Sequence, residues 1–432
     1  MKQTRSGVLC GVYLAAMGSL FLLAFLPGGY LQITAAKRVV FYSLTGLLLA
    51  GLVLCALVFR DKPLRKPGAA QYLVCAYWLC SLLSALCSPW PEIAYLGGQR
   101  DDGLLSVSLY CALFLALSLY AKPDKRLLWV FAAALTVHCA VCFLQLADRN
   151  PLGLYPEPLR WSGRETVYNG AFLGLTGNAD LSAAVLCLGF PACWVYGLRA
   201  RKPLFFLPAA LCLAVLLLAG MRGGLLGAVL GSCCALPWAL PLGRRGRLRL
   251  LAGLAASLLL LLAAVYFLPG SGLWHEAHTV LHGQLTDTLG SGRVYIWRNT
   301  LALLPDRLLL GGGPDTLGQR MTAVFTRVLP DGTVLTREID CAHNEYLNML
   351  LNQGLPALLA YLGALVCSLT GFLQQNSTAA AVTGSAVLCY LIQAFFGIAM
   401  PANAALYWCM WGLLEAARLD QTMARSFHLP LR

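Results

Sequence analysis

Hydrophobic residues fill the chain in long runs, each about as long as a helix that crosses a lipid bilayer. About 20 helical residues span the hydrocarbon core. Runs near this length without a solvated charge occur at residues 8–28, 38–59, 69–88, 103–121, 126–147, 179–197, 203–220, 223–242, 250–268, 350–372, 379–398 and 403–417. The sequence therefore predicts about twelve transmembrane helices. The last run is short and could instead lie tilted or be only partly inserted.

Composition points to the same fold class. Of the 432 residues, 59% are hydrophobic and 12% are charged, and the mean hydropathy is +0.68. Soluble globular proteins are far more polar. We therefore expect an all-α polytopic membrane protein in which residues 1–432 form a single integral membrane domain. The first run is interpreted as a span and not as a cleaved signal, because it is long and no small-residue cleavage site follows Leu26.

Lys and Arg are distributed unevenly between the loops, and short basic loops stay in the cytoplasm. One alternate set of loops carries more than half of the 32 basic residues, whereas the short loops of the other set hold Lys37, Arg38, Arg100 and Arg222. We therefore expect both termini to be cytoplasmic. The net charge of +13 then reflects topology and contact with anionic membrane lipids, and no nucleic-acid partner is expected.

Two longer segments, residues 148–180 and 269–342, fall on the extracytoplasmic side of this topology. The larger one contains helix-like pieces such as LWHEAHTVLHGQL and GRVYIWRNTLALLP, so we expect it to form a helical cap before the C-terminal helices. Its three histidines, His275, His278 and His282, lack the i, i+4 spacing of zinc proteases, and a surface helix without metal is the preferred interpretation. The GGGPD sequence at 311–315 indicates a turn, since no Lys-Ser/Thr of a phosphate loop follows it.

Two outer arginines are candidates for binding an anion. Arg222 follows the outer end of a span in MRGGLLGAVLG, where helix packing explains the glycines but not the cation. The alternatives are a snorkelling anchor or an internal salt bridge. Arg293 begins the apolar stripe of SGRVYIW, where helix N–H groups and a guanidinium can bind phosphate together. A solvated arginine on a capped amphipathic helix is the alternative there.

His343 in CAHNEYLNMLL precedes an apolar helix that returns to the membrane. Its ordinary pKa near ~6.5 lets an imidazole accept a proton from a hydroxyl at neutral pH, although an interfacial histidine can also be purely structural. Two guanidinium groups and an imidazole on one side of the membrane suggest chemistry on an anionic, lipid-linked substrate. Further candidates for contact with sugar or phosphate on this side, which could instead cap helices or mark span ends, are Arg100, Arg164, Asn178, Asn344 and Tyr346.

Four motifs in this order, LTGNADLSAAV, MRGGLLGAVLG, SGRVYIW with LLLGGGPDTL, and AHNEYLNMLLNQGLPALL, resemble the O-antigen ligase and polymerase superfamily over roughly residues 90–400. The resemblance implies a GT-C-like fold and a metal-independent, cofactor-free, inverting glycosyltransferase in the bacterial cytoplasmic membrane. Its donor would be an oligosaccharide on undecaprenyl diphosphate, and its acceptor a hydroxyl of a glycan, lipid or protein outside the membrane.

The resemblance also implies roles for individual residues. Arg222 and Arg293 would hold the diphosphate, and His343 would activate or orient the acceptor hydroxyl. The family's first motif often reads Ser-Arg-Gly, and here Met221 replaces the serine. The sequence does not separate a polymerase from a ligase. A flippase for the same lipid-linked sugar is the alternative, but it would place charged residues at mid-span and not on one side.

The predicted topology can be checked by labelling with a membrane-impermeant thiol reagent. In a variant without the 17 native cysteines, Arg222→Cys and His343→Cys should be labelled from outside in cells whose cytoplasmic membrane is intact. Lys62→Cys and Arg245→Cys should react only after the cytoplasmic membrane is opened. Labelling of positions 222 and 343 from opposite faces would contradict the topology.

Overall fold

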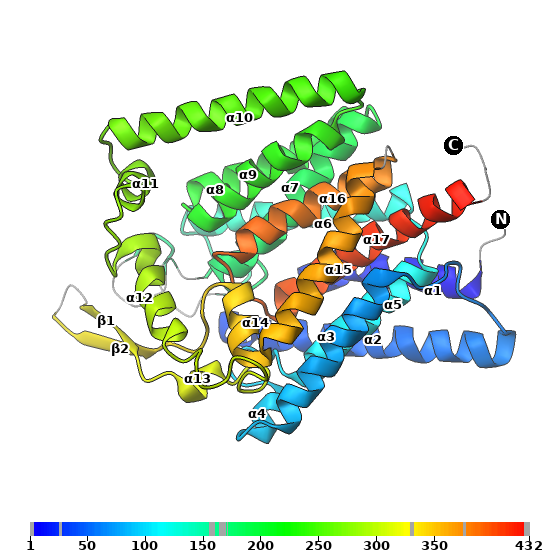
Figure 1. Ribbon diagram of the computed structural model, residues 1–432, viewed down its shortest axis with the longest axis horizontal. Helices are drawn as coiled ribbons and strands as arrows, with labels where there is room; N and C mark the ends of the chain where they lie inside the picture. Colours follow the sequence, from blue (N-terminus) through cyan, green and yellow to red (C-terminus); the bar gives the residue numbers. More distant parts are fainter. Residues whose placement is uncertain are drawn as a thin grey trace.

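The computed structural model describes residues 4–25, 28–154, 160–163, 170, 172–328, 332–374 and 377–426, and it is mostly helical. A helix of one bundle overlaps each predicted span (Figure 1), although the span expected at residues 350–372 begins within the short helix α14 (Glu345–Gln353). The bundle helices are α1 (Arg5–Ala16, continued by a π-helical turn over Met17–Phe21), α2 (Tyr30–Phe59), α3 (Ala69–Leu86), α5 (Leu104–Tyr120), α6 (Lys125–Leu146), α7 (Ala179–Arg199), α8 (Phe206–Leu218), α9 (Arg222–Ala239), α10 (Arg244–Phe267), α15 (Leu355–Gln374), α16 (Thr378–Ala394) and α17 (Pro401–Ser426).

The structure is mostly helical, which is consistent with the expected all-α membrane protein. Within the described residues, 6 helices are long and apolar enough to cross a membrane, namely α2, α3, α6, α7, α10 and α15, and several others are apolar but shorter. The number of about twelve spans stays a prediction. The last helix, α17, is not short, because it extends over 26 residues.

Short elements lie together at one end of the bundle. The start of α1 and the end of α17 lie at the opposite end (Figure 1). These short elements are α4 (Pro91–Leu96), α11 (Leu273–Leu281), α12 (Leu289–Leu301), α13 (Leu317–Arg320), α14 (Glu345–Gln353) and the strands β1 (Val324–Val328) and β2 (Val334–Glu338). The described parts of residues 269–342 therefore lie at the end of the bundle opposite to the start of α1 and the end of α17.

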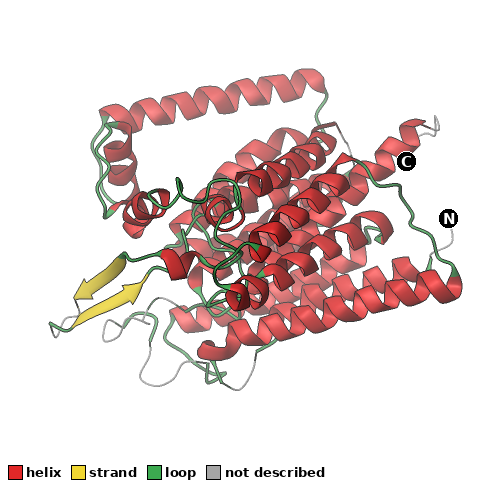
Figure 2. Ribbon diagram, turned by 60° about the horizontal axis from the view of Figure 1, so that its bottom comes forward, coloured by secondary structure: helices red, strands yellow, loops and turns green. Residues whose placement is uncertain are grey.

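The hairpin of β1 and β2 was not expected in a helical cap. The two strands pair antiparallel, with Val324 opposite Glu338 and Val328 opposite Val334, and the hairpin projects from the cap in Figure 2. The sequence does carry its signal. Val and Thr occupy every second position over Val324–Val328 and at Val334 and Thr336, and a Pro-Asp-Gly sequence lies between the strands, which is typical of a hairpin.

The most buried long helix of the bundle is α7, which packs against α8, α9, α16 and α17. Leu181, Ala184 and Leu188 on it are fully buried. Its first turn is capped by the Asn178 side chain, which accepts a hydrogen bond of 2.7 Å from the backbone N–H of Asp180. The backbone of Asp180 is therefore fixed at the cap end of the bundle.

Helices α9 and α16 approach closely because glycines line the contact. A Cβ atom at Gly227 would lie 2.7 Å from Cβ of Gln393, and one at Gly231 would lie 2.5 Å from Cα of Cys389. Side chains larger than hydrogen would force the helices apart. The close packing that the sequence suggested for this glycine run is confirmed.

Helix α10 stands apart from the rest of the bundle (Figure 1). Leu259, Leu260 and Leu261 occupy consecutive positions and are 68%, 72% and 49% exposed. Because 3.6 residues complete a turn, apolar side chains are uncovered on several faces of this helix. We expect lipid to surround most of α10.

Lys37 is not a loop residue, as its grouping with the outer loops implied. It lies within α2 and is fully buried. Its Nζ donates to the carbonyl oxygens of Phe21 and Leu22, the latter at 2.7 Å, where the first helix ends. A cation at a helix C-terminus satisfies carbonyls that have no helical partner. Lys37 thus fastens the first helix to the second.

The contact between α9 and α16 predicts opposite outcomes for one substitution at two glycines. Gly231→Ala should lower the stability by about 1–3 kcal/mol, since its new methyl group meets backbone atoms. Gly253→Ala on α10 should leave the stability unchanged or raise it by about 0.5–1 kcal/mol, because nothing lies within 4 Å of its Cβ position. Thermal unfolding in detergent measures both, and equal stability of the two variants would contradict the packing.

Candidate functional site

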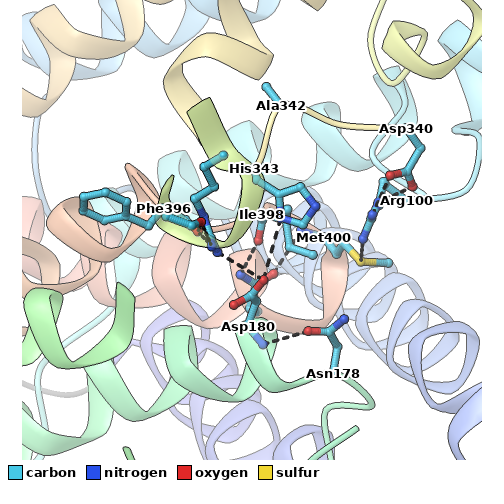
Figure 3. A network of polar contacts seen from close by, with 12 residues as sticks. Arg100, Asn178, Asp180, Asp340, Ala342, His343, Phe396, Ile398 and Met400 are labelled. Atoms are coloured by element: carbon cyan, nitrogen blue, oxygen red, sulfur yellow. Dashed lines mark hydrogen bonds and ion pairs between the residues drawn. The ribbon is translucent and has the colours of Figure 1, made fainter. Parts of the chain in front are cut away.

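Three helices begin around one carboxylate at the cap end of the bundle (Figure 3). Asp180 lies in the first turn of α7, Arg293 opens the regular part of α12, and His343 immediately precedes Asn344, the N-cap residue of α14. Helix N-termini carry partial positive charge and free N–H groups. The site is therefore suited to hold a negatively charged group.

Arg293 is held by backbone carbonyls. Its Nε and Nη2 donate to the carbonyl oxygen of Phe396 at 3.1 and 2.8 Å, and its Nη1 donates to that of Gly290 at 3.0 Å. Gly290, Ser291 and Gly292 before it all have positive φ, so the SGR motif forms a left-handed turn that aims the guanidinium away from α12. The Nη2 atom lies 3.5 Å from Oδ2 of Asp180.

His343 meets the same carboxylate from the other side. Its Nδ1 lies 3.7 Å from Oδ2 of Asp180, and its backbone adopts an unusual positive φ of 47°. Burial alone would lower the pKa of His343, but negative charge at Cys341 and Asp180 outweighs burial and raises the pKa to about 9. The imidazole is therefore mostly protonated at neutral pH in the substrate-free protein.

The residue before His343 is anchored on two helices. The indole Nε1 of Trp297 on α12 donates to the carbonyl oxygen of Ala342 at 3.0 Å, and the Asn348 side chain on α14 accepts from the Ala342 N–H at 3.2 Å. Arg293 and His343 thus approach each other because the two helices that carry them share these contacts.

Arg222 begins α9 but does not touch Asp180, Arg293 or His343 by any polar contact within the described residues. Its Nη1 donates to the carboxylate of Glu276 on α11, and its side chain is 46% exposed. The next residue, Gly223, packs against Phe396, because a Cβ atom there would lie 2.9 Å from Cβ of that residue. The backbone next to Arg222 and the guanidinium of Arg293 therefore both contact Phe396 in the segment after α16.

Arg100 is engaged by a carboxylate of the cap. Its Nη2 lies 2.7 Å from Oδ1 of Asp340 and its Nε 2.6 Å from Oδ2, so the pair is bidentate, and both side chains are at most 15% exposed. Figure 3 shows this pair beside His343 and Met400. The predicted contact of Arg100 with substrate stays a prediction, and the structure gives the side chain a role in tying the 97–103 loop to the cap.

The carboxylate of Asp315 also holds the 97–103 loop. Its Oδ2 accepts hydrogen bonds from the backbone N–H groups of Gly98, Arg100 and Asp102, the first at 2.6 Å. Burial raises the pKa of Asp315 to about 6 although these hydrogen bonds oppose the shift. The GGGPD sequence forms a turn, as predicted. Its aspartate accepts hydrogen bonds from the neighbouring backbone N–H groups.

A small polar cavity lies under this loop. It has a volume of about 40 Å³, and Asp102, Asp315 and Glu345 contribute carboxyl groups to its wall. Burial raises the pKa of Asp102 and of Glu345 to about 8, with like charge nearby adding to the effect. These two carboxyl groups therefore keep their protons near neutral pH.

The other residues predicted to contact substrate form hydrogen bonds within the fold. Asn178 caps α7, and the Oδ1 of Asn344 accepts from the N–H of Leu347 at 3.0 Å as the cap of α14. The hydroxyl of Tyr346 donates to the carbonyl oxygen of Leu391 at 2.7 Å. Contact of these residues with substrate stays a prediction, and Arg164 lies outside the described residues.

The cap histidines make local contacts. Nδ1 of His278 lies 2.7 Å from the carbonyl oxygen of Val265, and the ring of His282 stacks on Tyr266 with centroids 4.4 Å apart. These contacts fix α11 against the end of α10.

Sequence reasoning missed three carboxylates that organise the arginines and the histidine. They are Asp180, Glu276 and Asp340. For Asp180 a signal was present, because the motif LTGNADLSAAV places an Asn cap and an acidic residue at the start of an otherwise apolar span. For the other two, only the folded cap reveals the partner.

Residues 207–362 match the family described as O-Antigen ligase. The match covers a little over a third of the chain and includes Arg222, Arg293 and His343. It supports the resemblance to the O-antigen ligase and polymerase superfamily that the sequence motifs indicated. Together with the apolar helices, it indicates a membrane enzyme of the glycan ligase or polymerase type. No curated protein matches the chain.

The pairing of Arg100 with Asp340 can be measured by a double-mutant cycle. Arg100→Leu and Asp340→Leu should each cost about 3–5 kcal/mol, since each leaves a largely buried charge without its partner. The double variant should lose much less than the sum of both. Unfolding in detergent measures the three variants, and additive losses would contradict a direct pair. An active, stable double variant would also exclude Arg100 from substrate binding.

Proposed function

We propose that this enzyme moves an oligosaccharide from undecaprenyl diphosphate to an acceptor hydroxyl on the outer face of the bacterial cytoplasmic membrane. The observation that carries the proposal is the convergence of Arg293, His343 and three helix N-termini on one carboxylate at the cap end. A donor with a diphosphate leaving group requires such concentrated positive charge. The acceptor is a glycan in a polymerase, and a lipid or protein in a ligase.

The two arginines of the matched region are suited to the two phosphates. Arg293 is fixed by Phe396 and Gly290, so it loses little freedom when it binds an anion. Arg222 is half exposed, and its guanidinium can exchange Glu276 for a phosphate oxygen. Because the backbone next to Arg222 and the guanidinium of Arg293 both contact Phe396, a diphosphate placed over this segment can reach both guanidinium groups.

His343 in its neutral form then serves as the base. The acceptor oxygen forms a bond to the anomeric carbon as its proton passes to the imidazole, and the bond from that carbon to the diphosphate oxygen breaks. The electron pair leaves with the diphosphate, whose charge the arginines stabilise. Attack opposite to the leaving group inverts the anomeric configuration.

We propose that the reaction needs neither metal nor cofactor. The diphosphate is already a good leaving group, and guanidinium groups with helix N-termini can supply the stabilisation that a divalent ion gives in other phosphate sites. Activity in the presence of a chelator is the corresponding expectation.

Reconstitution in liposomes with a defined undecaprenyl-diphosphate oligosaccharide and a chelator tests this function. Glycan transfer and release of undecaprenyl diphosphate are followed together. His343→Ala should slow transfer by about 10² to 10⁴-fold while donor binding persists, since the residue acts on the acceptor's proton. Arg293→Ala and Arg222→Ala should weaken donor binding as well as transfer.

Arg298→Ala is the matched control. Arg298 lies on α12 like Arg293, but it is 61% exposed and pairs with Asp287 at 2.8 Å, so its loss should leave transfer unchanged. Full activity of all three site variants would refute the proposed site. Movement of intact donor across the membrane without bond cleavage would favour the flippase.

A further inference from the structure

We propose that Asp180 is a positioning residue that fixes the ring of His343 and selects the nitrogen that receives the acceptor's proton. The proposal rests on the proposed function and deepens it. Asp180 lies outside the region of the chain that matches the family.

The geometry assigns different tasks to the two nitrogens of the imidazole. Nδ1 faces Oδ2 of Asp180 at 3.7 Å, and a carboxylate at this position favours a proton on Nδ1. Nε2 is then left without a proton in the neutral ring and can take one from the acceptor hydroxyl. When it does so, the carboxylate stabilises the imidazolium that forms, and the proton stays on the histidine until the product leaves.

Both partners of this contact are held by the fold. Asp180 belongs to the most buried long helix of the bundle and follows the Asn178 cap. His343 is held between Ala342, which is anchored on two helices, and Asn344, which caps α14. A carboxylate fixed by the membrane bundle thus sets the orientation of an imidazole fixed by the cap.

Arg293 limits how strongly Asp180 acts on the histidine. Its Nη2 lies 3.5 Å from the same Oδ2 atom, so one oxygen serves two cations. When a diphosphate binds Arg293, the guanidinium shares its charge with the phosphate, and Asp180 becomes freer to polarise the imidazole. Donor binding and activation of the base are therefore coupled through one atom.

Other charged or titratable groups also face His343, and a test must separate them from Asp180. From the elements packed around the ring they are Arg293 of α12, Arg100 of the 97–103 loop, Asp340 and Cys341 before α14, and Glu345 of α14. Asp340 is neutralised by Arg100, and Glu345 keeps its proton near neutral pH. Cys341 is buried and contributes to the raised pKa of His343, so Cys341→Ala is the necessary comparison.

The first experiment measures the pH dependence of transfer by the reconstituted enzyme. A base must be neutral to act, so the kcat/KM of the wild type should rise with pH towards the raised pKa of about 9 in the free enzyme. Asp180→Asn removes the negative partner, so its rising limb should shift to lower pH, towards the ordinary value near ~6.5. Its maximal kcat should fall by about 10² to 10⁴-fold, because the amide favours the wrong tautomer. Its donor KM should not increase, since no positive charge is lost.

Asp180→Glu keeps the carboxylate, so it should restore part of the activity. The rising limb of its pH profile should lie near the position of the wild-type limb. Cys341→Ala removes another group that raises the pKa of His343, so its rising limb should also shift to lower pH. Its maximal kcat should stay within a few fold of the wild type, because the carboxylate of Asp180 still faces Nδ1. Asp287→Asn is the matched control, since Asp287 pairs with Arg298 away from the site, and it should change neither parameter. A lower kcat in Asp180→Asn with an unmoved limb and a raised donor KM would overturn the positioning role.

A second experiment reads the histidine without requiring activity. Diethylpyrocarbonate modifies the neutral imidazole, and peptide mass spectrometry reports the modification of His343 at each pH. The midpoint should lie at lower pH in Asp180→Asn than in the wild type, and Asp287→Asn should not shift it. An unshifted midpoint, with His343→Ala still inactive, would reject the role of Asp180 and leave the proposed function intact. Full activity of His343→Ala would reject the proposed function, whatever the midpoint shows.

Discussion

One oxygen of Asp180 connects the membrane bundle to the cap. It lies within ion-pair distance of Arg293 from α12 and of His343 before α14. Both cations come from segments that follow the carboxylate by more than a hundred residues, so the contact depends on the whole bundle between them. Without this negative charge, two fixed positive groups and three helix N-termini would repel one another in a partly buried place. The carboxylate therefore stabilises the arrangement that a phosphate group would later use.

The three outer arginines differ in their partners, and the partner determines how freely each guanidinium can bind another anion. Arg100 is bidentate with Asp340 and little exposed, which suits a structural tie between two segments. Arg222 is half exposed and paired with Glu276 on a peripheral helix, so its partner can be exchanged at low cost. Arg293 is bound mainly to backbone carbonyls, which fix its direction while leaving its positive charge only partly neutralised.

The site extends beyond the part of the chain that defines the family match. Arg222, Arg293 and His343 lie within residues 207–362, but Asp180 lies before them, and Phe396 lies after them. The N-terminal and C-terminal helices of the bundle are thus more than a scaffold. They contribute the negative charge and the carbonyl group that orient the matched residues, which ties the geometry of the reacting groups to the packing of α7, α9 and α16.

The sequence by itself determined the helices, because hydrophobic runs of bilayer length require internally satisfied backbone groups. It also indicated a turn at Asp315 and the resemblance to the family, since these depend on residues that are close together in the chain. The glycine run at Gly231 indicated close helix packing, but the partner helix was known only from the structure. The sequence located Arg222, Arg293 and His343 as candidates from their motifs.

Only the tertiary structure decided which charges meet. Lys37 looked like an outer loop residue, but it is buried within α2 because carbonyls from the end of another helix accept its hydrogen bonds. Asp180, Glu276 and Asp340 pair with residues that lie between 54 and 240 positions away in the sequence. Hydropathy and spacing describe single segments, whereas an ion pair depends on the distance between two of them, and that distance is set by packing.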